Sequence, residues 1–148
     1  MNLRDMSGLE LVQAMRDGKF PHPSIADTIP MWVSEAGPGC VKFRVRADRR
    51  HLNPLGGVHG GFAATVLDSV TGCAVHTMLE AGVGYGTIDL NVKMLEAVPL
   101  DQDLIAEGRV LHVSRILGVS EGSLRDAEGI LLAHATCTCA ILQPKAEP

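Results

Sequence analysis

The sequence predicts an α+β fold in which one antiparallel sheet wraps around a single buried helix. Residues 59–80 form an apolar run dense in Ala, Val and Gly, which indicates one long helix. The stretches that follow alternate apolar with polar residues, as half-buried strands do: 88–94, 103–114, 116–125 and 130–142. Short turns join these stretches, so neighbouring strands are expected to be antiparallel.

The segment before the long helix predicts a short N-terminal helix and one or two strands. Ser7 and Glu10 have the spacing of a capping box, and Gly18 follows the apolar face as a stop. Residues 39–47 alternate apolar and basic side chains, which predicts a half-buried strand. Near the other end, Asp126–Gly129 is expected to form a hairpin turn.

Length and composition indicate one domain with an aliphatic core. The chain has 148 residues, of which 46% are hydrophobic but only 3% aromatic, so the core depends on Ala, Val, Leu, Ile and Met. The net charge of −4 favours neither nucleic acid nor an anionic membrane as a partner. No apolar run approaches the roughly 18 residues that span a bilayer, and the N-terminus lacks a signal-peptide core. We therefore expect a soluble, cytoplasmic, single-domain protein over 1–148, with 1–28 as N-terminal helix and lead-in and 143–148 as a tail.

The four cysteines are expected to be reduced, buried and structural. No CxxC pair is present, and no Cys/His cluster has the spacing of metal ligands, so no metal is predicted. Cys137 and Cys139 lie two residues apart in an alternating segment, which directs both side chains to the same face of a strand.

A serine-hydrolase-like motif and five isolated histidines are weak indications of catalysis. Gly118–Gly122 reads GVSEG and matches the nucleophile elbow of serine hydrolases, but that motif needs a following helix and here a strand follows. A bulge or turn is the preferred interpretation. Isolated histidines are more often structural than catalytic, and five fall in this class: His22, His51, His76, His112 and His134.

Asp68 is the carboxylate that most needs an explanation. It lies within the apolar helix, and the sequence offers nothing basic between Arg50 and Lys93. An unpaired carboxylate in apolar surroundings is energetically costly. Asp68 is therefore either a hydrogen-bonded core residue or a functional group.

The start of the same helix is a candidate site for an anion. His59 is followed by Gly60 and Gly61, and glycines there let a ligand approach the N–H groups that the first helical turn leaves unpaired. A developing oxyanion would be well placed against those donors. A glycine-rich turn chosen for tight packing is the alternative.

Spacing along the helix indicates that Gly60 and Asp68 act in different copies of a site. Eight residues separate them, which is about 12 Å along an α-helix. A reacting carbonyl must lie about 3 Å from each group, or one water further from the carboxylate. Two antiparallel helices related by a two-fold axis could bring Gly60 of one subunit to Asp68 of the other.

These residues resemble a known family. Asn53, His59-Gly60-Gly61 and Asp68 form the pattern N-x5-H-G-G-x6-D, and GTIDLNVKMLEAVP follows at 86–99. Together they are similar to the hotdog-fold acyl-CoA thioesterases of the phenylacetate-pathway (PaaI-like) type, over roughly residues 30–143. The resemblance implies a hotdog fold, hydrolysis of an acyl-CoA to free acid and CoA, and a homodimer or dimer of dimers with sites at the dimer interface.

The resemblance also implies a role for each motif residue. Asp68 would be general base or nucleophile, and the Gly60 N–H the oxyanion donor. Asn53 would assist at the thioester carbonyl, His59 would orient that region, and Thr87 would help to place the water. No cofactor is implied, because coenzyme A is part of the substrate.

Substrate-binding residues are expected around these groups. The apolar tunnel for the acyl group has Met31, Trp32 and Phe62 as candidate walls, and Gly61 adjoins the oxyanion site. The CoA phosphates need cations, for which Arg115 is one candidate among several: Arg44, Arg46, Arg49, Arg50, Arg109 and Arg125. Two alternatives stay open: a non-catalytic acyl-CoA-binding hotdog protein, and an acyl-thioester hydratase or dehydratase, which usually pairs its carboxylate with a histidine in a different motif.

Overall fold

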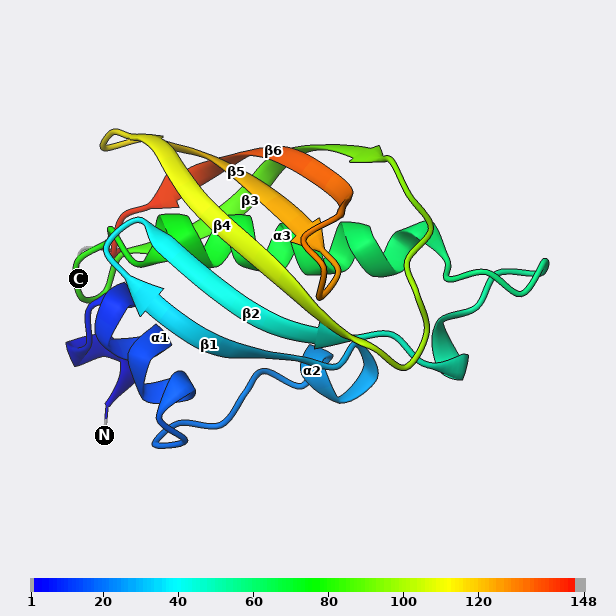
Figure 1. Ribbon diagram of the computed structural model, residues 1–148. Helices are drawn as coiled ribbons and strands as arrows, with labels where there is room; N and C mark the ends of the chain where they lie inside the picture. Colours follow the sequence, from blue (N-terminus) through cyan, green and yellow to red (C-terminus); the bar gives the residue numbers. More distant parts are fainter. Residues whose placement is uncertain (1, 146–148) are drawn as a thin grey trace.

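The computed structural model describes residues 2–145 (Figure 1). Its elements, in chain order, are η1 (Leu3–Asp5), α1 (Gly8–Arg16), α2 (Ile25–Thr28), β1 (Met31–Gly37), β2 (Cys40–Arg46), η2 (Arg49–His51), α3 (Gly60–His76), β3 (Gly84–Met94), β4 (Asp103–Val113), β5 (Leu117–Arg125) and β6 (Leu131–Leu142). The six strands form one antiparallel sheet in the order β1-β2-β4-β5-β6-β3. Figure 1 shows this sheet curving around α3, which confirms the predicted α+β architecture.

The helix α3 is buried by the sheet on most of its surface. Its inward side chains are among the least exposed in the chain, and they include Val66, Leu67, Val70 and Val75 at 0%. Where α3 passes β4 at Gly108, the helix lies so close to the sheet that the strand has no room for a side chain. A Cβ added at Gly108 would lie 2.1 Å from the Val70 carbonyl oxygen. Close approach of helix and sheet therefore requires glycine on β4.

The GVSEG segment is a regular part of the sheet, so the expectation of a bulge or turn there was wrong. Gly118–Gly122 pairs with both β4 and β6 within β5, and the local register shift lies opposite it in β4, between Val110 and His112. Ser120 is 0% exposed and donates a hydrogen bond of 3.1 Å to the Thr71 carbonyl. The serine is held against α3 and has no access to a substrate.

Both ends of the predicted long helix are shifted inward. His59 is its N-cap, and the helix ends at His76 rather than at residue 80. The Thr77 hydroxyl donates to the Ala74 carbonyl and accepts the Gly39 N–H, which ties the end of the helix to the β1–β2 turn. After a short connection, Gly84 begins β3, where an edge strand tolerates a glycine.

The N-terminal helix has the predicted capping box. The Ser7 hydroxyl accepts the Glu10 N–H at 3.2 Å, and the Glu10 carboxylate accepts the Ser7 N–H at 2.8 Å. Gly18 follows the helix with φ of 69°. The hairpin turn at 126–129 is also confirmed, because the Asp126 carboxylate accepts the N–H groups of Glu128 and Ile130.

Two of the cysteines are buried and share one face of a strand, as predicted. Cys137 and Cys139 are 1% and 0% exposed, and their sulfur atoms lie 3.7 Å apart on one face of β6. Cys40 and Cys73 are only half-buried. Of the expected tail, 143–145 has no regular structure and 146–148 lies outside the described residues. Within residues 2–145, no helix combines the length and apolarity needed to cross a membrane.

Candidate functional site

Asp68 is paired with Thr87, which the fold brings to it from a different element. Asp68 lies on the half-buried side of α3, and Thr87 lies on β3, the edge strand that crosses that helix. The Thr87 hydroxyl donates a hydrogen bond of 2.8 Å to Asp68 Oδ1. The register of β3 against β6 shifts between Thr87 and Asp89. Irregularities of this kind re-aim side chains, and here Thr87 is aimed at the carboxylate.

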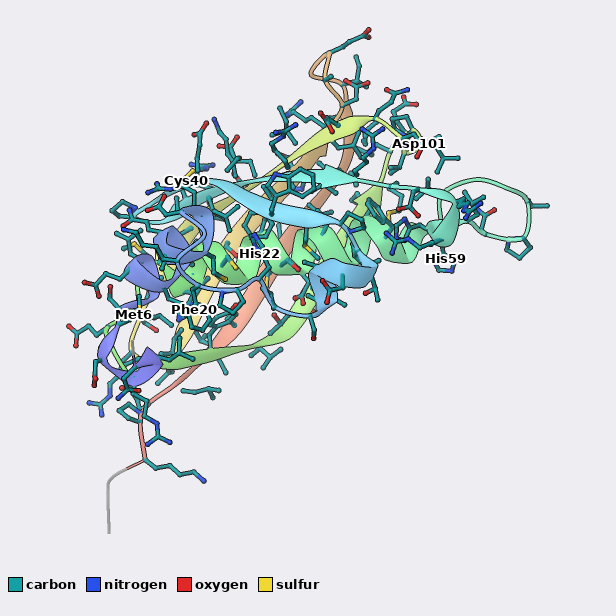
Figure 2. The ribbon with its side chains drawn as sticks, turned by 90° about the horizontal axis from the view of Figure 1, so that it is seen from below. Met6, Phe20, His22, Cys40, His59 and Asp101 are labelled. Atoms are coloured by element: carbon teal, nitrogen blue, oxygen red, sulfur yellow. The ribbon has the colours of Figure 1, made fainter. Side chains whose placement is uncertain are left out.

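Asp68 and Thr87 lie at a pocket of about 230 Å³. The wall opposite α3 is apolar and comes from β1 and β2, with Met31, Trp32, Val33 and Phe43. A third side is formed by the 15–26 segment, defined here as Met15 to Ala26, which contributes Met15, His22, Pro23, Ile25 and Ala26. Figure 2 shows His22 of this segment near the middle of α3. An acyl chain would find apolar walls here beside one carboxylate.

The N-terminus of α3 presents a backbone N–H donor in a separate hollow. The Gly61 N–H donates to His59 Nδ1 at 2.8 Å, so this ring nitrogen carries no proton. The Gly60 N–H has no acceptor within residues 2–145. Helix N-terminal N–H groups attract anions. His59 therefore caps the helix and leaves the Gly60 donor available to a ligand.

Asn53 shapes the loop that precedes this donor. Its Oδ1 accepts the N–H groups of Leu55 and Gly57, at 2.9 and 3.1 Å. The Asn53 N–H also donates to the Gly57 carbonyl at 2.7 Å. The carbonyl end of the side chain thus has a structural task, and the Nδ2 end is the part that could reach a substrate.

One chain does not bring the Gly60 donor to the Asp68 carboxylate. The two residues lie eight positions apart on the straight course of α3, about 12 Å. Gly60 and His59 line a different hollow, with Met94 and the 95–98 segment, and no lining residue is common to the two pockets. Figure 2 shows His59 at the end of the helix, away from His22. Within the described residues, the carboxylate and the helix N-terminal donor thus lie in two separate hollows.

The other predicted substrate-binding residues are dispersed. Trp32 lines the Asp68 pocket, and the Arg44 guanidinium lies 5.4 Å from the centre of its ring. Phe62 is 2% exposed and packs on the His51 ring at 5.0 Å, so it does not line that pocket. Arg115 is exposed in the β4–β5 turn, at the end of the molecule where α3 ends (Figure 1).

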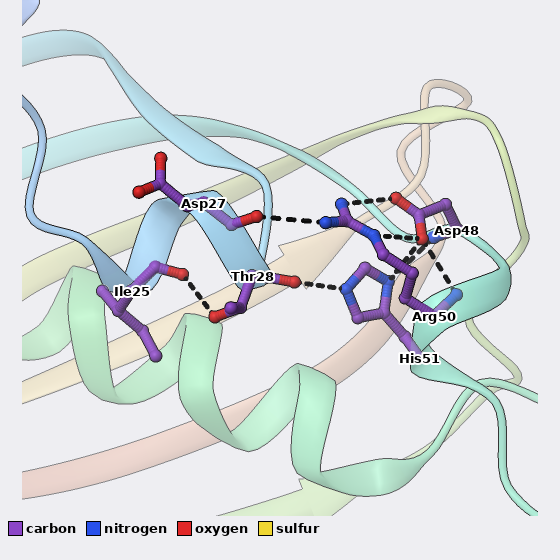
Figure 3. A network of polar contacts seen from close by, with 6 residues as sticks. All are labelled: Ile25, Asp27, Thr28, Asp48, Arg50 and His51. Carbon is purple, nitrogen blue, oxygen red and sulfur yellow. Dashed lines mark hydrogen bonds and ion pairs between the residues drawn. The ribbon is translucent and has the colours of Figure 1, made fainter.

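Most of the candidate arginines already have partners in the chain. Arg44 and Arg46 pair with Asp103, and Arg109 pairs with Glu121. Arg50 binds Asp48 and donates to the Asp27 carbonyl (Figure 3). Arg125 donates to the Gly129 carbonyl. Arg49 and Arg115 have no side-chain hydrogen bond or ion pair within residues 2–145.

The polar contacts around Arg50 hold together the elements next to the pocket. His51 Nδ1 accepts the Asp48 N–H at 2.9 Å, and its Nε2 lies 2.6 Å from the Thr28 carbonyl, so Nε2 carries the proton (Figure 3). The Arg50 guanidinium holds the pKa of Asp48 well below its usual range. These contacts fix α2, which overlaps the end of the 15–26 segment, against the loop that leads to Asn53.

Several residues of the Asp68 pocket were not found from the sequence, and Tyr85 and Cys73 are the two with titratable side chains on α3 and β3. Tyr85 and Cys73 lie at the α3–β3 contact and line the Asp68 pocket. Burial raises the pKa of the Tyr85 hydroxyl, and burial also raises the pKa of the Cys73 thiol to about 11. Both groups are therefore neutral at ordinary pH. The sequence offered one signal that could have drawn attention to Tyr85, which is that it is the single tyrosine of the chain. Among the described residues, no group of three or more His, Cys, Asp or Glu side chains could hold a metal ion.

This fold places the chain among the hotdog proteins. A solved structure from Ralstonia eutropha, described as a candidate thioesterase related to phenylacetic acid degradation, matches with a TM-score of 0.79 and 30% identity, over 87% of this chain and 98% of that one. A hypothetical thioesterase from Streptococcus pneumoniae, solved with coenzyme A, matches with a TM-score of 0.71 and 24% identity, over 78% and 91% of the two chains.

The chain belongs to the thioesterase superfamily, whose family model matches residues 55–133. Acyl-coenzyme A thioesterase 13 of Homo sapiens is 28% identical over 104 residues, which cover 70% of this chain and 74% of that protein. A candidate esterase of Halobacterium salinarum is 38% identical over 97 residues, 62% of this chain. This match spans 63% of the Halobacterium protein, just under two thirds of its length.

Proposed function

We propose that the protein is an acyl-CoA thioesterase, which hydrolyses an acyl-CoA to the free acid and CoA. The observation that carries the proposal is the Thr87–Asp68 hydrogen bond at the mouth of an apolar pocket. A carboxylate on a water-accessible edge, beside apolar walls, suits attack on the carbonyl of an acyl group held in those walls. Membership in the thioesterase superfamily and the similarity to acyl-coenzyme A thioesterase 13 support this reading.

The complete site is proposed to form between two subunits. β3 is an edge strand of 11 residues with a free side, and Ile88 on it is 63% exposed. Long exposed edges are prone to pair with another chain. A two-fold axis beside β3 would set two α3 helices antiparallel and bring Gly60 of one chain toward Asp68 of the other. A dimer has two such sites, and a dimer of dimers would have four.

In the general-base route, Asp68 takes a proton from water while the water oxygen bonds to the thioester carbon. The Gly60 N–H of the second subunit stabilises the oxyanion, with the Asn53 amide beside it. Collapse of the intermediate breaks the C–S bond, and the proton on Asp68 passes to the departing sulfur. The products are the carboxylic acid and CoA thiol.

In the nucleophile route, Asp68 itself bonds to the thioester carbon and forms a mixed anhydride, which water then cleaves. A single turnover in ¹⁸O-labelled water with excess enzyme separates the two. The base route places the label in the first acid released. Attack of water on the Asp68 carbon of the anhydride leaves that acid unlabelled.

Arg49 and Arg115 are the proposed contacts for the CoA phosphates, because their side chains are not engaged within the described residues. The solved Streptococcus pneumoniae structure contains coenzyme A, which is consistent with such a ligand for the fold. Arg49→Ala and Arg115→Ala are expected to raise KM for acyl-CoA with little change in kcat. The same variants should leave the KM for an acyl-pantetheine thioester, which lacks the nucleotide phosphates, unchanged.

The decisive experiment is thiol release from an acyl-CoA panel by wild type, Asp68→Asn and Asp68→Ala. Hydrolysis by wild type and a loss on the order of 10³-fold or more in both variants is the expected result. Absence of thiol release by wild type from every thioester, or equal rates in the variants, would refute the proposal. Binding without turnover would instead favour the non-catalytic alternative.

A hydratase is the second candidate, because His22 lines the same pocket as Asp68. Hydration of an enoyl-CoA removes the conjugated absorbance without releasing thiol. An enzyme that shows this change, and loses it in His22→Gln as well as in Asp68→Asn, would be a hydratase.

A further inference from the structure

The ring of Tyr85 occupies space that a glycine on α3 leaves free. A Cβ added at Gly72 would lie 2.8 Å from Tyr85 Cε2 and 3.3 Å from the Tyr85 hydroxyl. Gly72 is buried in the interior of the helix, where glycine is less stable than alanine. Its presence therefore needs a packing reason, and the Tyr85 ring supplies one.

The ring is held in this position from behind. The His76 imidazole packs on it with ring centres 5.1 Å apart and a tilt of 47°. Cys73 contacts the tyrosine hydroxyl, and the raised pKa of that hydroxyl reflects its burial. A side chain packed on three residues of one helix has little freedom to swing aside.

Tyr85 stands at the end of the pocket away from the reactive carboxylate. Along α3 the lining runs from Asp68 and Ser69 to Cys73, and no residue of the helix beyond Cys73 contributes to it. Asp68 and Cys73 are five residues apart, about 7.5 Å along the axis. Tyr85 precedes Thr87 by two residues on β3, so both side chains face the same side of the strand.

We propose that Tyr85, seated on Gly72, sets the depth of the acyl pocket and restricts the enzyme to compact acyl groups. This inference rests on the proposed thioesterase function. It assigns the substrate range of the enzyme to the contact between Tyr85 and Gly72. The pocket of about 230 Å³ lies below the range of roughly 300–1,000 Å³ that is usual for small-molecule sites. Short-chain or single-ring acyl groups fit this size, and long alkyl chains would meet the tyrosine ring.

The test is a chain-length profile of kcat/KM, from acetyl-CoA to dodecanoyl-CoA, for wild type and three variants. Tyr85→Ala opens the inner end, and each methylene that becomes buried is worth about fourfold in kcat/KM. Two or three such methylenes raise the preference for the longer chain on the order of 15- to 60-fold. Tyr85→Phe keeps the ring and is expected to keep the wild-type profile. Gly72→Ala displaces the ring into the pocket and is expected to lower kcat/KM at least about fivefold for the longest chain that wild type accepts.

A double variant tests the contact itself. In a Tyr85→Ala background the Cβ of Gly72→Ala meets no ring, so its effect on the profile is expected to disappear. Gly84→Ala is the matched control, because it adds a methyl next to Tyr85 on β3 that meets only Leu142, at 3.8 Å. Circular dichroism shows whether each variant folds. If Gly72→Ala does not fold, the chain-length profile of Tyr85→Ala is sufficient to test the proposal.

The outcomes separate this inference from the proposed function. Hydrolysis by wild type with an unchanged chain-length profile in Tyr85→Ala refutes the depth role and leaves the thioesterase proposal intact. A wild type that hydrolyses no thioester refutes the proposed function, and the depth role is then measured by calorimetric binding of S-alkyl-CoA thioethers. A shift of the preferred alkyl length to longer chains in Tyr85→Ala supports the depth role, and an unchanged length preference overturns it.

Discussion

The Thr87 hydroxyl and the Asp68 carboxylate are joined by a hydrogen bond of 2.8 Å across the contact between β3 and α3. Because the hydroxyl has one proton and donates it to Oδ1, the second carboxylate oxygen stays available to a water or a thioester carbon. Thr87 is therefore proposed as a positioning residue, which acts on the reaction through Asp68.

Removal of the Thr87 hydroxyl is expected to lower kcat more than it changes KM. Hydrogen bonds to charged groups contribute about 1.5–3 kcal/mol, so Thr87→Val is predicted to lose roughly 10- to 100-fold in kcat. Thr87→Ser keeps the donor and should recover most of that loss. Equal kcat in the Val and Ser variants would show that the hydroxyl does not position the carboxylate.

Gly60→Pro is a direct test of the oxyanion donor, because proline removes the N–H without opposing the helix. Gly60 is the first helical residue, where proline is favoured, and His59 has φ −61° and ψ 136°, as a residue before proline requires. We expect kcat to fall by about 10²- to 10³-fold with the helix content unchanged. Gly60→Ala retains the N–H and meets the same Met94 side chain, so a similar loss in that variant would point to crowding instead.

Mixing two inactive variants tests whether the site is shared. A subunit with Asp68→Asn still supplies Gly60, and a subunit with Gly60→Pro still supplies Asp68, so a mixed dimer has one intact site. After unfolding and refolding together, about half of the dimers are mixed and roughly a quarter of wild-type activity should return. A site contained in one chain would give no recovery above the sum of the separate variants.

The first turn of α1 rests directly on the last turn of α3. A Cβ added at Gly8 would lie 1.7 Å from the His76 carbonyl oxygen, and the Gly8 N–H donates to the Leu79 carbonyl at 3.0 Å. Gly8→Ala is expected to lower the free energy of unfolding by about 1–3 kcal/mol, measured by urea denaturation. Gly37→Ala is the control, since its Cβ meets no atom within 4 Å and a change within about 0.5 kcal/mol is expected.

His76 predicts a loss of stability in mild acid. Burial lowers the pKa of its imidazole from the ordinary value of 6.5, so in the unfolded chain the group binds a proton at a higher pH than in the fold. The stabilising contribution is complete above about pH 6.5 and falls as the pH drops toward the folded-state pKa. His76→Gln should flatten the rise of unfolding free energy between about pH 5 and 7, whereas His112→Gln on exposed β4 serves as control. An unchanged slope in His76→Gln would contradict the assignment.

The elements, and the positions of the candidate carboxylate and donor on the long helix, could be predicted because their signals are local. The capping box of Ser7, the alternation along β3 to β6, and the isolated charge of Asp68 are each visible within a few residues. The separation of Gly60 from Asp68 followed from helix geometry alone. The fold confirms that the two lie in different hollows of one chain.

The rest of the pocket could not be predicted because it depends on contacts distant in sequence. Phe62 and Asp68 are six residues apart on α3, about 120° around the axis, so one faces the core when the other faces the pocket. The 15–26 segment and Tyr85 line the pocket only because the N-terminal region and β3 pack across the helix in the folded chain. The surroundings of Ser120 could not be predicted for the same reason, since its burial depends on α3 rather than on its own motif.

The proposed sharing of the site between the α3 helices of two chains has a consequence for how activity depends on protein concentration. A chain whose helix offers its carboxylate to one reaction and its N-terminal donor to another is catalytically incomplete when it is alone. Specific activity is then expected to decline on dilution, in parallel with dissociation of the pair, and to be restored by concentrating the sample. The working unit would be the pair of chains, with protein concentration itself acting as a control on turnover.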